Sequence, residues 1–340
     1  MINIQEYVDV KEFSALRLGG QFRYFTIINK IEDLKEVISF VKDKDLKIFI
    51  LGGGSNVVFS DGVINVMALK MEINGFAIIN QNDDYVDIKI GSGEIWDRIV
   101  EKTVEMNLSG FEALSAIPGT VGATPVQNVG AYGSEVKDTI LEVEVFDMVT
   151  KTIVIISNED CKFGYRDSIF KNEAKGKYII ISVTYRLSKS SAKIPEYPGV
   201  KRYFLDNNIN NPHVKDIREA VISIRNSKLP NWKEFPNLGS FFKNPIVSKE
   251  IAKKMQDKYS TLKVFPFEGG MVKIPAGWLM ENAGLKGRSF GTISVYEKNA
   301  LVLVNNGGAS KEDLVRAKNE IIKIVNEKFG IILEQEPEMV

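Results

Sequence analysis

The chain has 340 residues, which is enough for two or three domains and a substantial buried core. Lys plus Arg and Asp plus Glu each number 44, so the formal net charge is zero, and the composition favours neither nucleic acid nor an anionic membrane as a partner. The amino terminus lacks a signal pattern, and no apolar run approaches the ~20 residues that span a bilayer. These observations predict a cytoplasmic protein.

The sequence contains one cysteine, Cys161, and one histidine, His213. A single cysteine excludes an internal disulfide and fits a reducing compartment. A zinc site of the usual Cys/His kind cannot be assembled from one residue of each type, so we expect no metal site. Proton transfer is therefore expected from carboxylate, hydroxyl, lysine or tyrosine groups.

The amino-terminal part of the sequence reads as strand, helix, strand. Residues 22–28 are strand-like, 31–45 carry apolar side chains at helical spacing, and 47–51 form a short apolar run. A turn signal at Asn74-Gly75 then divides a region of strands between 63 and 90. The other predicted elements are helices that begin near Gly93, at Val214 and after Ser310, and strands at 140–146, 151–156, 178–187 and 331–334.

Polar and proline residues gather between Ser188 and Asn211, where we expect a domain boundary. The last long helix is expected to start at the N-cap residue Ser310 and to stop at Gly330, which suits a left-handed C-cap. The succession of elements predicts an α+β fold in several domains.

Residues 52–56, Gly-Gly-Gly-Ser-Asn, follow a predicted strand. Three glycines remove every Cβ, so consecutive amides can converge on a diphosphate, although a tight turn is the simpler explanation for a lone glycine run. A Rossmann site needs a helix directly after its glycine motif, whereas residues 57–59 read as a strand. The Rossmann interpretation is therefore excluded.

A second stretch, residues 115–133, is rich in glycine, alanine and proline and follows neither the helical nor the strand period. A close approach of two layers would explain its glycines. The Ser, Thr, Gln and Asn residues among them suit hydrogen bonds to a flat heteroaromatic ring and to phosphates. Both interpretations stay open from these residues alone.

An ordered set of motifs resembles one known family. The motifs are GGGSNVV at 52–58, GSGEIW at 91–96, IPGTVGATPVQNVGAYGSEV at 117–136, FGYRDSIFK at 163–171, GSFFKNP at 239–245 and EPE at 336–338. Each motif alone is weak, but their order is typical of the UDP-N-acetylenolpyruvoylglucosamine reductase (MurB) family. The resemblance extends from about residue 13 to the end of the sequence.

The resemblance implies a vanillyl-alcohol-oxidase-type FAD-binding domain of two lobes and a separate α+β substrate-binding domain. The implied boundaries are 1–66 for the first FAD lobe, 67–205 for the second, 206–330 for the substrate domain, and 331–340 for a segment that returns to the active site. A tyrosine loop near 190–203 resembles that of the type I subgroup.

The resemblance also implies how FAD binds. In relatives with covalent flavin a His or Cys forms the bond; the two glycine-rich loops contain neither, so the FAD is expected to be noncovalent. The loop 52–56 would lie on the diphosphate and the stretch 115–133 on the isoalloxazine. The implied cofactor residues are Gly52, Gly53, Gly54, Ser55, Asn56, Ser115, Pro118, Gly119, Gly122, Thr124, Gln127, Asn128, Gly130 and Ala131.

The implied activity is NADPH-dependent reduction of UDP-N-acetylglucosamine enolpyruvate to UDP-N-acetylmuramate in peptidoglycan precursor synthesis. NADPH gives a hydride to FAD, the reduced flavin gives a hydride to C3 of the enolpyruvyl group, and C2 receives a proton. An enol ether accepts hydride poorly, so the site needs positive or hydrogen-donating groups at the adjacent carboxylate and an acid at C2. The sequence itself does not distinguish NADPH from NADH.

Three residues match the catalytic positions of the family. Arg166 would stabilise the enediolate with its planar guanidinium, Glu338 would act as a protonated donor at the same carboxylate, and Ser240 would supply the proton. From the residues alone, Arg166 is explained as well by a surface pair with Asp167. The corresponding alternatives for Ser240 and Glu338 are a small turn residue and a solvated tail residue.

Four further residues match the substrate contacts of the family: Tyr197, Lys228, Asn244 and Glu281. Tyr197 would close over the nucleotide end of the substrate, although Tyr203 is near enough to compete, and Lys228 suits a phosphate. The alternatives are a surface aromatic for Tyr197 and a basic residue that closes the preceding helix for Lys228.

The sequence departs from the family at two places. Val340 stands where many members have an arginine, which removes one electrostatic contribution and predicts a poorly anchored Glu338. Residues 13–17, Phe-Ser-Ala-Leu-Arg, stand where an Asn-Thr pair is common. A flavoprotein oxidase on the same scaffold and an inactive binding protein are the competing interpretations, and the family likeness suggests a monomer.

Overall fold

The structure is a computed structural model that describes residues 2–190 and 192–340, and its contacts divide the chain into two compact units. Of the described residues, unit 1 contains 2–8, 22–54 and 65–227. Unit 2 contains 9–21, 55–64 and 228–340. Two short amino-terminal segments therefore belong with the carboxyl-terminal part of the chain. The domain boundaries expected from the sequence were contiguous and did not include this exchange.

The main elements of unit 1 are strands β1 (Gln5–Asp9), β2 (Gln21–Ile28), β3 (Lys47–Leu51), β5 (Val63–Met71), β6 (Phe76–Gln81), β7 (Tyr85–Gly91), β10 (Ile140–Asp147), β11 (Thr152–Ser157) and β12 (Tyr178–Ser188), and helices α1 (Ile31–Asp43), α2 (Trp96–Glu105), α3 (Pro198–Asp206) and α4 (Val214–Lys228). The short strands β8 (Gly130–Ala131) and β9 (Ser134–Glu135) form a small ribbon.

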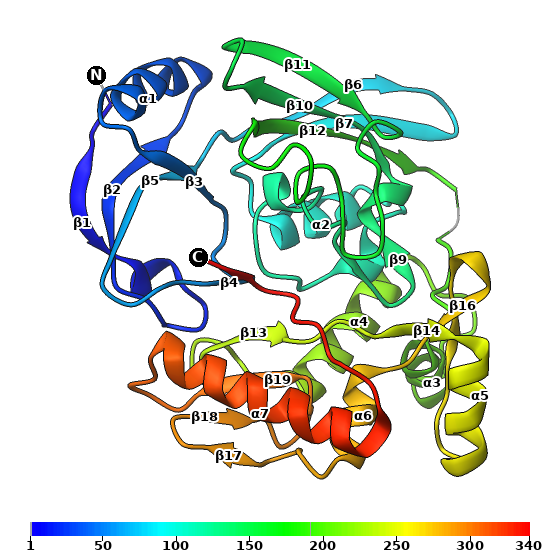
Figure 1. Cartoon of the computed structure of the whole chain (residues 1–340). Helices are drawn as coiled ribbons and strands as arrows, with labels where there is room; N and C mark the ends of the chain where they lie inside the picture. The colour runs from blue at the N-terminus through cyan, green and yellow to red at the C-terminus, as the bar shows by residue number, and fades with distance from the viewer. Residues whose placement is uncertain (1, 191) are drawn as a thin grey trace. The chain divides into compact units, whose positions relative to one another are not determined.

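The first lobe of unit 1 is a sheet of order β1-β2-β5-β3 with α1 packed on it (Figure 1). Leu34 and Val37 of α1 are fully buried in a core with Met67 of β5, as the helical spacing predicts. The helix ends two residues earlier than expected, at Asp43, because Asp45 adopts a left-handed φ of 50°.

The second lobe is an antiparallel sheet of order β11-β10-β12-β7-β6, with α2 against one face (Figure 1). Phe146, Ile179 and Ile181 of this sheet pack into the core of the first lobe, so the two lobes share apolar side chains. The helix α2 starts at Trp96 rather than near Gly93, because the amide of Gly93 bonds to Ile73 and the chain turns first.

The expected boundary near residue 206 lies later, after Ser227. Helix α4 stays with unit 1 because Arg218 donates to both carboxylate oxygens of Asp97, at 2.6 and 3.2 Å. The polar stretch that indicated a boundary also contains α3, with Pro198 at its start and Val200 fully buried. Its apolar side chains were too few for the helical period to be evident in the sequence.

Unit 2 is built on an antiparallel sheet of order β13-β19-β18-β17, covered by α7. Ser310 accepts the amide of Asp313 at the start of α7, and Gly330 ends the helix with a φ of 67°, which confirms both predicted caps. The elements of unit 2 are β4 (Val57–Val58), β13 (Asn237–Ser240), β14 (Ile246–Ser248), α5 (Lys249–Lys258), β15 (Phe265–Pro266), β16 (Met271–Lys273), α6 (Ala276–Asn282), β17 (Ser289–Phe290), β18 (Ile293–Val295), β19 (Val302–Asn305), α7 (Lys311–Phe329) and β20 (Glu338–Met339).

The strand predicted at residues 331–334 is wrong. Ile331 and Leu333 are buried, which produces the alternating pattern, but this segment has no strand pairing of its own. The final strand is β20, which pairs in parallel with β4. None of the helices among the described residues combines the length and the apolarity needed to span a bilayer.

Candidate active site

The glycine loop after β3 packs against the second glycine-rich stretch inside unit 1. A Cβ on Gly53 would lie 2.7 Å from the Cα of Gly119, and a Cβ on Gly52 would lie 3.0 Å from Oγ1 of Thr120. Side chains do not approach a backbone within 3.0 Å without displacement, so this contact requires glycine at position 53. The two loops expected to hold the diphosphate and the ring of a flavin are therefore neighbours.

The groups that this loop offers fit an anionic cofactor. Among the described residues, the amides of Gly53 and Gly54 take part in no hydrogen bond. Nζ of Lys70 donates to the carbonyl of Gly52 at 2.7 Å, and burial lowers the pKa of this lysine. Two available amides with a lysine against the loop form a suitable donor set for a diphosphate, so Gly53 and Gly54 would hold that part of FAD.

The polar side chains of the second loop bond within the protein. Ser115 donates to a main-chain carbonyl at 2.7 Å, and Oγ1 of Thr124 lies 2.6 Å from the hydroxyl of the fully buried Tyr185. Asn128 is fully buried and donates to Glu135 at 2.9 Å. The hydrogen bonds of these three side chains fix the shape of the loop.

Arg166 lies beside this second loop. Its Nη2 donates to the carbonyl of Gly130 at 2.7 Å, and a Cβ on Gly130 would come within 3.2 Å of its Nη1. Its φ of 56° is left-handed, a strained conformation that tends to gather at functional sites. Asp167, the alternative partner, accepts a hydrogen bond from Asn172 at 2.8 Å. The guanidinium is thus placed against the predicted flavin loop.

Tyr197, the tyrosine predicted to close over the substrate, contacts the second glycine-rich stretch. The ring of Tyr197 stands edge-on to the ring of Tyr132, with 4.9 Å between the ring centroids. Tyr132 belongs to the stretch 115–133 that is predicted to contact the flavin. Tyr203 lies inside α3 and packs against a neighbouring ring of the same helix. Tyr197 is 36% exposed at the N-cap of α3, so part of the residue is accessible to solvent.

Arg225 is a charged residue that the sequence analysis did not single out. Its charge interacts with the hydroxyl of Tyr132, and burial lowers the pKa of the arginine and raises the pKa of the tyrosine. Arg225 lies three residues before Lys228, which places both cations on one face of α4. This i, i+3 spacing is the signal that would have found it.

In unit 2 the carboxyl-terminal segment runs antiparallel to the chain that follows Ser240. Main-chain hydrogen bonds and a β-bridge join residues 334–336 to residues 241–243. Continuing this register by one residue would set Ser240 opposite Pro337, the residue before Glu338. Figure 1 shows the same course, with the red terminal segment passing β13 on its way to β4. The main-chain segments that carry Ser240 and Glu338 therefore run side by side in unit 2.

The expectation that Glu338 is poorly anchored is wrong. The amide of Glu338 donates to the carbonyl of Asn56 at 3.1 Å, within the parallel pairing of β20 and β4. The amide of Val340 donates to Val58 at 2.9 Å, and the ammonium of Lys311 donates to the carbonyl of Val340 at 2.9 Å. The main chain is fixed on both sides of the Glu338 side chain.

The predicted substrate residues other than Tyr197 lie in unit 2. Lys228 ends α4 and is the first residue of the carboxyl-terminal segment of this unit. Oδ1 of Asn244 accepts a hydrogen bond at 2.9 Å from the amide of Ala276, the first residue of α6. Glu281 on α6 forms an exposed ion pair with Lys286 at 2.7 Å. The loop 52–56 is itself divided, with the three glycines in unit 1 and Ser55 and Asn56 in unit 2.

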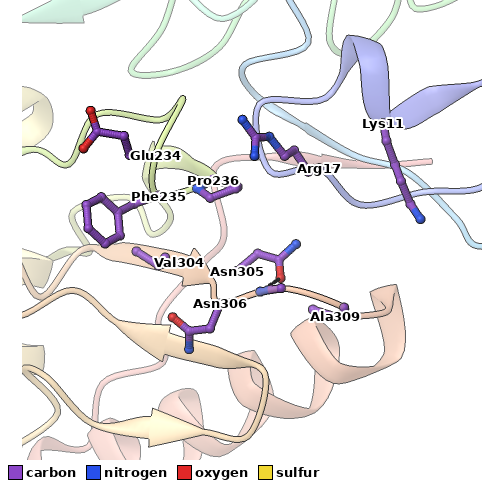
Figure 2. A pocket seen from close by; sticks show the side chains of 11 residues that line it. Lys11, Arg17, Glu234, Phe235, Pro236, Val304, Asn305, Asn306 and Ala309 are labelled. Atoms are coloured by element: carbon purple, nitrogen blue, oxygen red, sulfur yellow. Dashed lines mark hydrogen bonds between the residues drawn. The ribbon is translucent and has the colours of Figure 1, made fainter.

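A hollow of about 520 Å³ lies in unit 2 beside the loop 304–309 (Figure 2). Its polar side chains bond within the protein: Arg17 donates to the carbonyl of Lys233 at 2.6 Å, and Asn305 donates to that of Leu16 at 3.0 Å. Among the described residues that line it there is none of the predicted cofactor, catalytic or substrate residues. The hollow is therefore not the candidate active site.

Comparisons with known proteins identify the family of this chain. Residues 23–156 match an FAD-binding domain family, and residues 230–340 match the carboxyl-terminal domain of UDP-N-acetylenolpyruvoylglucosamine reductase. The chain is 40% identical over 336 residues to the UDP-N-acetylenolpyruvoylglucosamine reductase of Flavobacterium johnsoniae, covering 98% of this chain and 99% of that protein. The chain belongs to the UDP-N-acetylenolpyruvoylglucosamine reductase family.

Other members of this family match equally fully. The reductase of Bdellovibrio bacteriovorus is 41% identical over 336 residues, covering 99% of this chain and 99% of that protein. The crystal structure of the Thermus caldophilus reductase covers 100% of this chain and 98% of its own, with a TM-score of 0.68 at 21% identity, which supports the fold. The expected α+β fold class, the FAD cofactor and the class of FAD-dependent oxidoreductase are confirmed. The individual site residues stay predictions.

Proposed function

We propose that this chain catalyses the NADPH-dependent, FAD-mediated reduction of UDP-N-acetylglucosamine enolpyruvate to UDP-N-acetylmuramate in peptidoglycan precursor synthesis. The observation that supports this most directly is the antiparallel pairing of the carboxyl-terminal segment with the chain that follows Ser240, which brings the segments carrying Ser240 and Glu338 together. A hydroxyl and a carboxyl group from these two segments would match the two needs of the reaction, at C2 and at its neighbouring carboxylate.

When bound, FAD supplies the hydride chemistry, by accepting a hydride from NADPH and passing one to C3 of the enolpyruvyl group. The residues of this chain would handle the charge and the proton that accompany it. Negative charge develops through C2 into the substrate carboxylate, where the Arg166 guanidinium would form two charge-assisted hydrogen bonds. Glu338, in its protonated form, would donate a further hydrogen bond to that carboxylate.

Ser240 would deliver the proton to C2. A hydroxyl is a weak acid, but the carbanion-like C2 is a strong base once hydride has arrived, so the transfer runs downhill. Ser240 is exposed, whereas Phe241 and Phe242 are each only 1% exposed and hold the adjacent main chain in the core. Solvent then restores the serine proton, and the balance is one hydride from NADPH and one proton added across the double bond.

The remaining predicted residues would bind the ends of the substrate and cofactor. Tyr197 would close over the nucleotide end, and Lys228 would neutralise a phosphate, with Asn244 and Glu281 nearer the sugar. Gly52, Gly53 and Gly54 would hold the FAD diphosphate through main-chain amides. We also propose that the protein is a cytoplasmic monomer. Light scattering during size-exclusion chromatography would test the oligomeric state.

The proposed function is tested by separating the two half-reactions. Purified protein should carry FAD that bleaches with NADPH and regains its oxidised spectrum anaerobically when UDP-N-acetylglucosamine enolpyruvate is added. Ser240→Ala should leave bleaching unchanged and slow the return by at least about a hundredfold, as expected for loss of a general acid. Ser260→Ala, at an exposed serine of the same unit, is the matched control.

Two results would count against this function. Recovery of the oxidised spectrum only after oxygen is admitted would indicate an oxidase. Equal loss of both half-reactions in Ser240→Ala would mean that the substitution damages the shared site, and that Ser240 is no specific proton donor.

A further inference from the structure

Lys311 joins the start of α7 to the carboxyl-terminal segment inside unit 2. Its Nζ donates to the main-chain oxygen of Val340 at 2.9 Å and to Oγ of Ser60 at 2.7 Å. Oγ of Ser60 donates to the same oxygen at 2.5 Å, and the amide of Lys311 donates to the carboxylate of Asp61 at 2.9 Å. One lysine therefore connects the turn after β4, the first turn of α7 and the residue that follows β20.

Helix electrostatics alone do not explain a lysine at this position. Lys311 is the first residue of α7, where the positive end of the helix dipole disfavours a cation. The next two residues, Glu312 and Asp313, are acidic, as that dipole favours. The partly buried Lys311 side chain instead donates hydrogen bonds to Ser60 and Val340, so its contribution to stability comes from these two bonds.

We propose that Lys311 is a positioning residue for Glu338, assisted by Ser60. The pairing of β20 with β4 is only two residues long, and so short a strand does not fix its own register. The hydrogen bonds to Val340 hold the end of the strand, and thereby fix where the Glu338 carboxyl group lies. This inference rests on the role proposed above for Glu338.

The test uses the FAD-loaded protein and five variants, two at Lys311 and one each at Ser60, Glu338 and Lys323. Lys311→Met keeps the length of the side chain and removes its donors, Lys311→Arg restores a charged donor, and Glu338→Gln is the reference for loss of the acid. Lys323→Met is the matched control, because Lys323 is an exposed lysine on the same helix. Two quantities are measured in each: hydrogen exchange of the amides of residues 338–340, and the two half-reactions.

In Lys311→Met the amides of Glu338 and Val340 should exchange about ten- to a hundredfold faster, the range expected when a hydrogen bond from a charged donor is lost. Reoxidation of the flavin by the enolpyruvyl substrate should slow about tenfold, with kcat changed more than KM and with bleaching by NADPH unchanged. Lys311→Arg should restore both quantities. Ser60→Ala should produce the same changes to a smaller degree, because the lysine keeps its bond to Val340.

Wild-type exchange in Lys311→Met would overturn the inference, since the lysine would then hold nothing. Faster exchange in Lys311→Met with normal reoxidation would also overturn the inference, provided that Glu338→Gln is impaired. The hydrogen bonds of Lys311 would then exist without affecting the function of Glu338. Normal reoxidation in Glu338→Gln would overturn the proposed role of Glu338 itself, and this outcome is distinguishable because it does not depend on Lys311. A loss in Lys323→Met equal to that in Lys311→Met would assign the effect to helix α7 as a whole.

Discussion

Replacing Gly53 by alanine should loosen the contact between the two glycine loops. The new Cβ would stand 2.7 Å from the Cα of Gly119, which is 0.7 Å short of the 3.4 Å at which ordinary contact begins. The neighbour is main chain, which cannot rotate away as a flexible side chain can, so the loops must separate. Overpacking of this kind costs about 1–3 kcal/mol.

Two measurements follow from that cost. The melting temperature should fall by about 2–4 °C for each kcal/mol in a unit of this size, as scanning calorimetry would record. If FAD requires the native loop spacing, the same energy weakens its binding about 5- to 150-fold, measurable by titrating the deflavinated protein with FAD. Gly277→Ala is the matched control, because a Cβ there meets Leu301 at 3.4 Å, an ordinary contact, inside helix α6. Wild-type melting and FAD affinity in Gly53→Ala would refute the requirement for glycine.

Three further predictions concern unit 1. Asp97→Asn should destabilise the protein by about 1–3 kcal/mol at pH 7, as denaturant titrations would measure. Burial opposes the charge of Asp97, but hydrogen bonds from Arg218 and from the amide of Ala116 outweigh this effect and lower the pKa of the carboxyl group. The difference in stability from wild type should therefore shrink as the pH falls through that pKa. Tyr185→Phe should cost about 1 kcal/mol in the same assay, because it removes one buried hydrogen bond to Thr124 and leaves that hydroxyl its bond to Val121. Burial raises the pKa of Cys161 to about 12. The native protein should therefore resist alkylation by iodoacetamide at pH 8, whereas the unfolded protein should react. Rapid labelling of the native protein, detected by mass spectrometry, would contradict this prediction.

The sequence predicted the elements whose apolar period is strong and whose ends carry specific residues. Helix α7 has both, since its buried residues recur at helical spacing between Ser310 and Gly330. The exclusion of a Rossmann site also depended on a local pattern, the strand of residues 57–58 that directly follows the glycine loop. Such features are encoded within a few residues of each other, so one sequence is enough to identify them.

What the sequence did not predict depends on partners far along the chain. Ile331 and Leu333 alternate as a strand would, yet the pairing forms at Glu338 and Met339, because the available edge belongs to β4, some 280 residues earlier. The anchoring of Glu338 depends in the same way on Lys311, whose position in a helix gives no hint of a carboxyl-terminal partner. Periodicity describes a segment, whereas register and anchoring describe a pair of segments.

The division of the loop 52–56 between the units has a mechanistic consequence. Gly53 is fixed by its contact with Gly119 in unit 1, whereas Asn56, three residues later, accepts the amide of Glu338 in unit 2. A single short run of chain therefore carries the amides suited to the FAD diphosphate and the strand edge that sets the acid. A dinucleotide-binding fold would place a helix after its glycine motif, whereas here a strand follows, and that strand is the edge on which β20 pairs.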